Sequence, residues 1–192
     1  MEALTKLYGD DPKWSCDEQE RSVHAILDRM SPLVSILPTG AGKTGLILIP
    51  TLLEEGKSIV VTPYIPLAQE LEETCKKVKI DCIQWTPGTL WRAKIIVIVA
   101  DTATSGEFGT FLRDIFNEGQ LSRIHFDEAH TITREKHFRP KFEAFRRLCI
   151  PVPIHFITAT FPPTHEQAFE SELLLIQPRP TYIRAKTNRL NA

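Results

Sequence analysis

Short apolar segments alternate with segments of helical periodicity along the chain. Several apolar segments lack alternating polar positions, which is typical of strands that are covered on both faces of a sheet. We expect six strands, at Leu33–Ile36, Ser58–Thr62, Ile80–Ile83, Lys94–Val99, Ser122–Phe126 and Ile154–Thr158. The alternation of strands and helices predicts an α/β fold, with a mainly parallel sheet and helices on both faces.

Helical patterns occupy most of the intervals between these strands. Apolar residues follow i, i+3, i+4, i+7 spacing at residues 23–30 and again at 108–116. A capping-box sequence predicts a helix at about 164–175, and a proline suited to a first helical turn opens another at about 140–148. The segment 177–192 has four basic residues, no acidic residue and two prolines. We therefore expect one domain at residues 1–176, followed by a linker at 177–192.

Composition excludes several classes of protein. Apolar residues make up 42% of the chain, enough for a full core, and the net charge of −1 gives no support to nucleic-acid binding by overall charge. The four cysteines form no C-x-x-C pair, so neither a zinc ribbon nor a redox motif is indicated. The longest purely apolar run, Ile95–Ala100, is too short to cross a bilayer, and no targeting segment is visible. We expect no membrane partner.

The sequence "LPTGAGKT", residues 37–44, has the composition of a phosphate-binding loop. It follows an apolar strand and precedes an apolar helix, which is the context that such a loop requires. Glycines let the backbone fold tightly so that its N–H groups face phosphate oxygens, and the helix N-terminus adds a positive dipole end. Lys43 would reach the β- and γ-phosphates, and Thr44 would bind Mg²⁺. The complete set of expected ATP-binding loop residues is Pro38, Thr39, Gly40, Ala41, Gly42, Lys43 and Thr44. Leu37 stands where the usual pattern has its first glycine.

A second cluster, "IHFDEAHTITREKHF" at residues 124–138, contains three histidines and three carboxylates. It allows three interpretations: a metal cluster, a catalytic carboxylate pair or a solvated loop. The zinc-helix spacing H-E-x-x-H is absent, and we expect no zinc. Asp127 directly follows a strand, so it should lie at the carboxyl edge of the sheet, where ligands bind in such folds. We predict that Asp127 holds Mg²⁺ with Thr44 and that Glu128 is the general base for attacking water.

With these two motifs the chain resembles the first RecA-like lobe of superfamily 2 helicases. Further segments, "WSCDEQE", "VVTPYIPLAQEL", "FITATFPP", "FRP" and "RAKTNRLN", are similar to RecQ-like helicases, including the telomere-linked helicases of fungi. The resemblance covers about residues 14–191. It implies a RecA-like P-loop NTPase fold and ATP hydrolysis coupled to 3′→5′ movement along DNA, either a single strand or a tailed duplex. A nuclear location is expected in a eukaryote and a cytoplasmic one otherwise.

The resemblance also implies roles for single residues. Gln19 would read the adenine edge of ATP. His130, Arg139, Thr158 and Thr160 would couple hydrolysis to strand movement. Thr62 and Pro63 would contact the nucleic-acid backbone. Two tryptophans, at positions 85 and 91, are more typical of buried packing than of base stacking.

Two features depart from the family. The segment "TITREKH" has no aromatic residue where the family usually has a tryptophan in its aromatic-rich loop. The family supplies an arginine finger from a second RecA-like lobe, which is not part of this sequence. We therefore expect the lobe by itself to bind ATP and to hydrolyse it very slowly. Two alternatives stay open: an inert nucleotide- or nucleic-acid-binding module, and an RNA helicase or duplex translocase.

Overall fold

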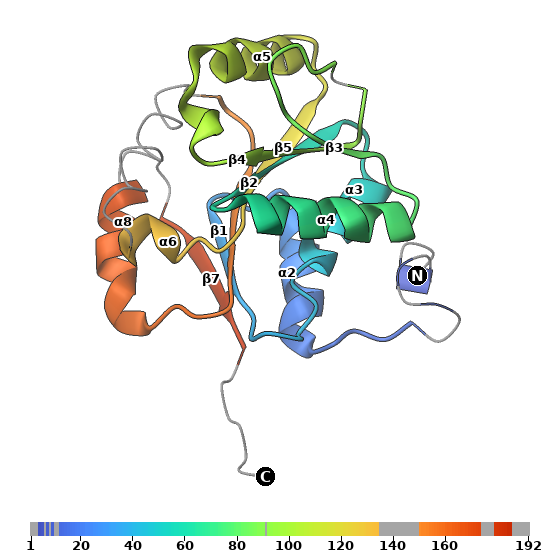
Figure 1. Ribbon diagram of the computed structural model, residues 1–192. Coiled ribbons are helices and arrows are strands. Elements are labelled where there is room, and N and C mark those ends of the chain that lie inside the picture. Colours follow the sequence, from blue (N-terminus) through green and yellow to red (C-terminus); the bar gives the residue numbers. More distant parts are fainter. Residues whose placement is uncertain are drawn as a thin grey trace.

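Seven strands form one sheet in the computed structural model, which describes residues 4, 5, 7, 9, 12–90, 92–134, 150–173 and 179–185. The order is β3-β4-β2-β5-β6-β1-β7, and every pairing is parallel. The strands are β1 (Leu33–Ile36), β2 (Lys57–Thr62), β3 (Cys82–Gln84), β4 (Ile95–Val99), β5 (Leu121–Phe126), β6 (Ile154–Thr158) and β7 (Thr181–Arg184). The predicted α/β fold with a parallel sheet is confirmed (Figure 1).

Helices cover both faces of this sheet. They are α2 (Asp17–Leu27), α3 (Gly45–Leu53), α4 (Ile65–Lys77), α5 (Gly106–Asn117), α6 (Thr131–Arg134) and α8 (Glu166–Leu173), with 3₁₀ turns at Thr102–Thr104 and Pro163–His165. One apolar cluster packs α2, α3 and α4 on one face, and a second packs α5, α6 and α8 on the other (Figure 1). The helices expected at 23–30, 108–116 and 164–175 correspond to α2, α5 and the segment ending in α8. The helix expected at 140–148 lies outside the described residues.

Local details of two helices differ from the sequence pattern. Met30 lies beyond the end of α2 and is 44% exposed, so it does not belong to the apolar face that the spacing predicted. Pro50 is buried inside α3, and the helix continues past it to Leu53. A proline removes only one backbone donor, and here less than one further turn of helix follows it.

Four neighbouring strands bring the sequence motifs to one edge of the sheet. Because the strands are parallel, their carboxyl ends meet at the same edge. There β1 leads into the loop of residues 37–44, β5 leads into Asp127, β6 ends at Thr158 and β2 ends at Thr62. In the order β2-β5-β6-β1 these ends are adjacent, so the motifs converge.

The C-terminal segment requires a correction. We expected residues 177–192 to leave the domain as a linker, but Thr181–Arg184 form strand β7, which pairs with β1 along its whole length. The guanidinium of Arg184 donates to the carbonyl of Phe161 and to the carboxylate of Glu166. The sheet thus extends beyond residue 176, because pairing with β1 stabilises a short strand that its basic composition does not predict.

Among the helices that the structure describes, none combines the length and the apolar character needed to span a membrane.

Candidate functional site

The loop between β1 and α3 folds as a tight turn. Gly40 and Gly42 have φ values of +84° and +75°, which are conformations that residues with a side chain rarely adopt. The N–H of Gly45 donates to the carbonyl of Gly42 at 2.9 Å, so helical bonding begins directly after the loop. Leu37 is fully buried in the apolar cluster, and its N–H extends the sheet by donating to Thr158 O at 3.0 Å. This burial accounts for a leucine in place of the usual glycine.

The side chain of Gln19 on α2 is hydrogen-bonded to the phosphate loop. Its side chain is fully buried, its Nε2 donates to the carbonyl of Gly42 at 2.9 Å, and its Oε1 accepts from the N–H of Ser15 at 2.8 Å. A Cβ on Gly42 would lie 2.2 Å from that Nε2. Glycine is therefore required at 42 both by its backbone conformation and by the approach of the amide. The expected contact of Gln19 with adenine stays a prediction.

Asp127 and Glu128 follow β5 at the same edge of the sheet. The N–H of Asp127 donates to Val61 O of β2 and the N–H of Ala129 donates to Ile157 O of β6, both at 2.9 Å, so neighbouring strands fix both ends of the turn. Between them Glu128 has φ +46°, a strained conformation for a residue with a long side chain. Such strain is concentrated at functional sites, where the surroundings enforce it.

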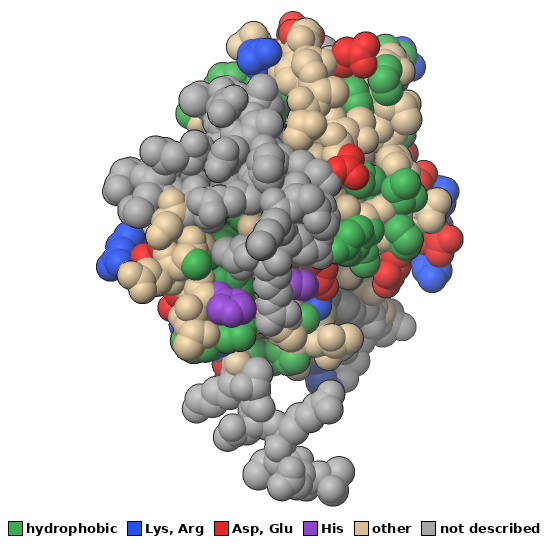
Figure 2. Space-filling view, turned by 60° about the vertical axis from the view of Figure 1, so that its left-hand side comes forward, with side chains coloured by type: hydrophobic (Ala, Val, Ile, Leu, Met, Phe, Trp, Pro, Cys, Tyr) green, Lys and Arg blue, Asp and Glu red, His purple; other side chains and the backbone are tan. Residues whose placement is uncertain are grey.

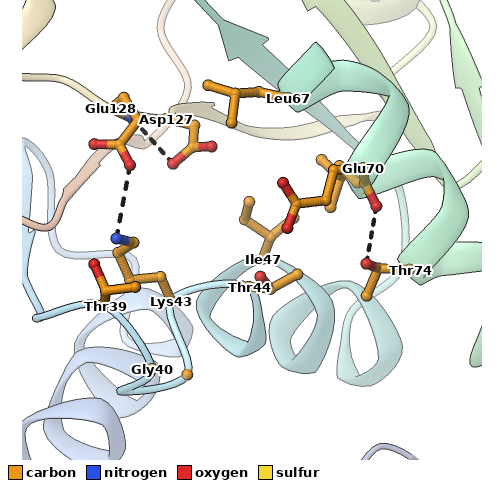
Figure 3. A pocket seen from close by; sticks show the side chains of 12 residues that line it. Thr39, Gly40, Lys43, Thr44, Ile47, Leu67, Glu70, Thr74, Asp127 and Glu128 are labelled. Carbon is orange, nitrogen blue, oxygen red and sulfur yellow. Dashed lines mark hydrogen bonds and ion pairs between the residues drawn. The ribbon is translucent and has the colours of Figure 1, made fainter.

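The loop and the carboxylates face each other across one cavity of about 460 Å³ (Figure 3). Lys43 Nζ lies 3.6 Å from Glu128 Oε1, and Asp127 points into the same space. The lining residues are Thr39, Gly40, Gly42, Lys43, Thr44, Ile47, Leu67, Glu70, Leu71, Thr74, Asp127 and Glu128. Pro38 and Ala41 belong to the same loop but do not line the cavity. The structure therefore brings together the phosphate loop and the acidic pair that the sequence pointed to separately.

The two carboxyl groups differ in their proton affinity. Burial, and then the neighbouring charge of Glu128, raise the pKa of Asp127 to about 6. The hydrogen bond from His130, followed by the charge of Lys43, lowers the pKa of Glu128 below its ordinary value. A divalent cation beside Asp127 would relieve the cost of its buried charge, so this carboxylate and the Thr44 hydroxyl are oxygen ligands that suit Mg²⁺.

His130 connects Glu128 to the end of β6. Its Nδ1 lies 3.0 Å from Thr158 Oγ1 and 3.2 Å from Glu128 Oε2. Thr158 Oγ1 donates to the carbonyl of Thr160 at 3.3 Å, so it accepts from His130, and Nδ1 carries the proton. Three of the four residues expected to couple hydrolysis to movement thus form one chain of contacts. The fourth, Arg139, lies outside the described residues.

One wall of the cavity was missed by the sequence analysis. Leu67, Glu70, Leu71 and Thr74 of α4 line it, and the carboxylate of Glu70 points inward (Figure 3). These four residues follow i, i+3, i+4, i+7 spacing and therefore share one face of the helix. The sequence signal that could have indicated this wall is Glu70, a carboxylate within that face.

The expected nucleic-acid contacts at Thr62 and Pro63 are buried in this conformation. Thr62 is fully buried and donates to the carbonyl of Tyr64 at 3.4 Å. Tyr64 and Ile65, at the start of α4, are 45% and 55% exposed. The surface of this segment therefore comes from the two residues that follow the predicted pair.

Within residues 124–134, the described part of the second cluster, His125 does not approach the acidic pair. His125 is fully buried, and its Nδ1 lies 3.1 Å from Nδ1 of His155 rather than beside Asp127. Within the described ranges no three side chains of the His, Cys, Asp or Glu type gather as a metal ion would require.

Comparison with known proteins supports a helicase domain. The family model described as DEAD/DEAH box helicase matches residues 16–168, most of the chain. ATP-dependent DNA helicase Q5 of Rattus norvegicus is 28% identical over 194 residues, spanning 91% of this chain and 20% of that protein. ATP-dependent DNA helicase RecQ of Bacillus subtilis is 29% identical over 163 residues, spanning 76% of this chain and 27% of that protein. The chain thus corresponds to about a quarter or less of these relatives.

Solved structures share the fold. The DUF1998 helicase MrfA bound to DNA superposes with a TM-score of 0.71, at 19% identity over 96% of this chain and 29% of that one. A second structure of MrfA, bound to DNA and AMPPNP, gives a TM-score of 0.70 with the same identity, over 96% of this chain and 28% of that one.

Proposed function

Because the chain belongs to the DEAD/DEAH box helicase family, we propose that it is the ATP-binding motor lobe of a RecQ-like DNA helicase. Hydrolysis of ATP here would drive 3′→5′ movement along DNA together with a second RecA-like lobe. The observation that carries the proposal is the shared cavity, in which Lys43 and Glu128 lie 3.6 Å apart with Asp127 beside them. A phosphate-binding cation, a metal-binding carboxylate and a base within one cavity are the parts that phosphoryl transfer to water requires.

Binding of the triphosphate rests on the loop. The positive end of the α3 helix dipole and the Lys43 ammonium would attract the β- and γ-phosphates. Thr44 and Asp127 would hold Mg²⁺, which neutralises phosphate charge when bound. Burial raises the pKa of Asp127 to about 6, and a bound cation would lower this pKa and favour the ionised carboxylate.

Glu128 is the proposed general base. Its lowered pKa keeps it ionised at neutral pH, so it can accept a proton from an attacking water. His130 Nδ1–H donates to both Glu128 and Thr158. A change in the charge or position of Glu128 would therefore alter the hydrogen bond at the end of β6. We assign coupling to this chain of contacts, and we assign adenine recognition to the segment that contains Gln19.

DNA contact is proposed for the start of α4. Tyr64 and Ile65 are exposed there, and the positive end of the helix dipole would attract a phosphate. Figure 2 shows acidic and basic side chains interspersed over one face of the molecule, without a wide basic area among the coloured residues. Among the coloured residues of this face we therefore expect localised rather than extended phosphate contacts.

Two variants test the proposal. Lys43→Ala should abolish binding of ATP·Mg²⁺ by the chain, measured by calorimetry. Glu128→Gln should retain that binding and, in a chain extended by its second lobe, lower DNA-stimulated hydrolysis by a factor of about 10² to 10⁴. Hydrolysis by Glu128→Gln at the parent rate would refute the assigned base. Unwinding of DNA and RNA duplexes with 3′ or 5′ tails tests polarity and substrate, and unwinding of RNA alone would overturn the DNA assignment.

A further inference from the structure

Four buried polar side chains form a continuous hydrogen-bonded chain on the face of the sheet that packs against α2. Ser35 Oγ donates to Ser22 Oγ at 2.9 Å, His155 Nε2 lies 2.8 Å from Ser35 Oγ, and His125 Nδ1 lies 3.1 Å from His155 Nδ1. None of the four is more than 3% exposed. Burying polar groups is costly unless they are paired, and in this network every side-chain nitrogen and hydroxyl except His125 Nε2 has a hydrogen-bond partner. The three directional bonds therefore constrain the relative positions of these side chains.

The hydrogen bonds fix which ring nitrogens carry protons. Since the Ser35 hydroxyl proton is directed at Ser22, Ser35 Oγ accepts from His155, and His155 Nε2 is the protonated nitrogen. His155 Nδ1 must then accept from His125 Nδ1–H. Both rings are neutral in this arrangement, and all three bonds run in one direction, from His125 to Ser22.

Each member of the chain belongs to an element that carries part of the candidate site. Ser22 lies on α2, three residues after Gln19, whose amide holds the carbonyl of Gly42. Ser35 lies on β1, which leads into the phosphate loop. His155 lies on β6 and His125 on β5, where they are directly paired across the two strands. These strands end at the coupling threonine and at the acidic pair.

We propose that Ser22, Ser35, His155 and His125 form a positioning network that holds Gln19 against the phosphate loop and ties this contact to strands β5 and β6. The network rests on the proposed nucleotide site, because its effect is exerted through the loop. Its members are positioning residues, because none of them lines the cavity. They would act through Gln19 and through the ends of strands β5 and β6.

The protein offers a matched control for the serine end of the network. Thr51 Oγ1 and Ser58 Oγ form another buried hydroxyl pair, at 3.1 Å, between α3 and β2. Ser58→Ala removes one buried hydroxyl bond without touching α2. Ser22→Ala and Ser58→Ala should therefore lower the urea midpoint of the chain by similar amounts. Only Ser22→Ala should weaken binding of a fluorescently labelled ATP with Mg²⁺, by about fivefold, the equilibrium equivalent of one neutral hydrogen bond.

A double-mutant cycle tests the route through Gln19. In a Gln19→Ala background, Ser22→Ala should change nucleotide affinity by less than about twofold, because the contact through which it acts is already gone. A purely structural role would weaken binding equally in both backgrounds. Equal affinities of Ser22→Ala and Ser58→Ala, or full additivity with Gln19→Ala, would overturn the proposal.

The histidine end has a readout that needs no nucleotide. Two-bond ¹H–¹⁵N correlation spectra of the imidazole rings at pH 7 should show His155 protonated at Nε2 and His125 at Nδ1. Charged rings or the opposite tautomers would overturn the network itself. If the parent chain fails to bind the labelled ATP, as Lys43→Ala is expected to, the proposed function fails, and the positioning role fails with it whatever the spectra show.

Discussion

Replacing Gly42 by alanine tests the contact between α2 and the phosphate loop. Gly42 has φ +75°, and a Cβ there would lie 2.2 Å from Gln19 Nε2 and 2.8 Å from Ser15 Oγ. Gly40 has the similar φ of +84°, but a Cβ there would meet nothing within 4 Å. Gly40→Ala therefore introduces comparable backbone strain without the collision, which makes it the matched control.

The expected losses of stability differ because of the amide. An L-residue in the left-handed conformation costs about 1–2 kcal/mol, so Gly40→Ala should lower the free energy of unfolding by that amount. In Gly42→Ala the Gln19 amide must also move away from the Gly42 carbonyl. A buried polar group left without its partner costs about 1–3 kcal/mol more. We therefore expect a total loss of about 2–5 kcal/mol for Gly42→Ala.

Urea unfolding of the nucleotide-free chain measures this difference without any contribution from phosphate binding. The double variant Gln19→Ala, Gly42→Ala should be more stable than the sum of the two single losses predicts, because removal of the amide relieves most of the collision. Equal losses for the two glycine variants, or strict additivity in the double variant, would show that Gln19 does not hold the loop in solution.

Four further outcomes follow from the buried charges and rings. The pKa of His155 is lowered to about 3 and that of His125 well below its usual 6.5 by burial, so the folded chain binds fewer protons than the unfolded one below pH 6.5. Stability should therefore fall with acidification through this range by up to about 1.4 kcal/mol per pH unit for each ring. The raised pKa of Asp127 has the opposite sign, so urea midpoints of Asp127→Asn should fall more steeply than those of the parent between pH 6.5 and 5. Arg123→Met leaves Glu54 and the carbonyl of Ile26 without their buried partner and should cost about 3–5 kcal/mol, whereas Arg179→Met breaks an exposed pair with Glu170 and should cost less than about 1 kcal/mol in the same denaturation assay. Trp85→Ala removes a buried ring that packs edge-on against Phe108 and should lower the free energy of unfolding by about 3–5 kcal/mol, against little change for the exposed Leu90→Ala.

Local sequence was sufficient for the elements that carry strong chemical patterns. The phosphate loop was identified because glycines and Lys43 stand between a strand and a helix, and Asp127 because it follows an apolar strand directly. Their convergence followed from the parallel sheet, since parallel strands end at the same edge. The expectation that Trp85 is buried packing was also confirmed, at 4% exposure.

Features that depend on distant pairing were not predictable from local sequence. Strand β7 exists because it pairs with β1, about 150 residues earlier in the chain, which its own short sequence does not reveal. Thr62 is buried because β2 lies inside the sheet, so the exposed surface passes to Tyr64 and Ile65. The pairing of His125 with His155 follows from the register of β5 and β6, which no local pattern specifies.

The ion pair between Lys43 and Glu128 joins the proposed phosphate-binding ammonium to a carboxylate of the protein itself. The Glu128 carboxylate is paired with the Lys43 ammonium, which would also bind a γ-phosphate oxygen. The phosphate would therefore compete with Glu128 for Lys43. If a phosphate displaced the carboxylate from Lys43, Glu128 would lose one of the charges that lower its pKa, and its basicity would rise. Binding of phosphate at Lys43 would thus raise the basicity of the residue that we propose activates the attacking water.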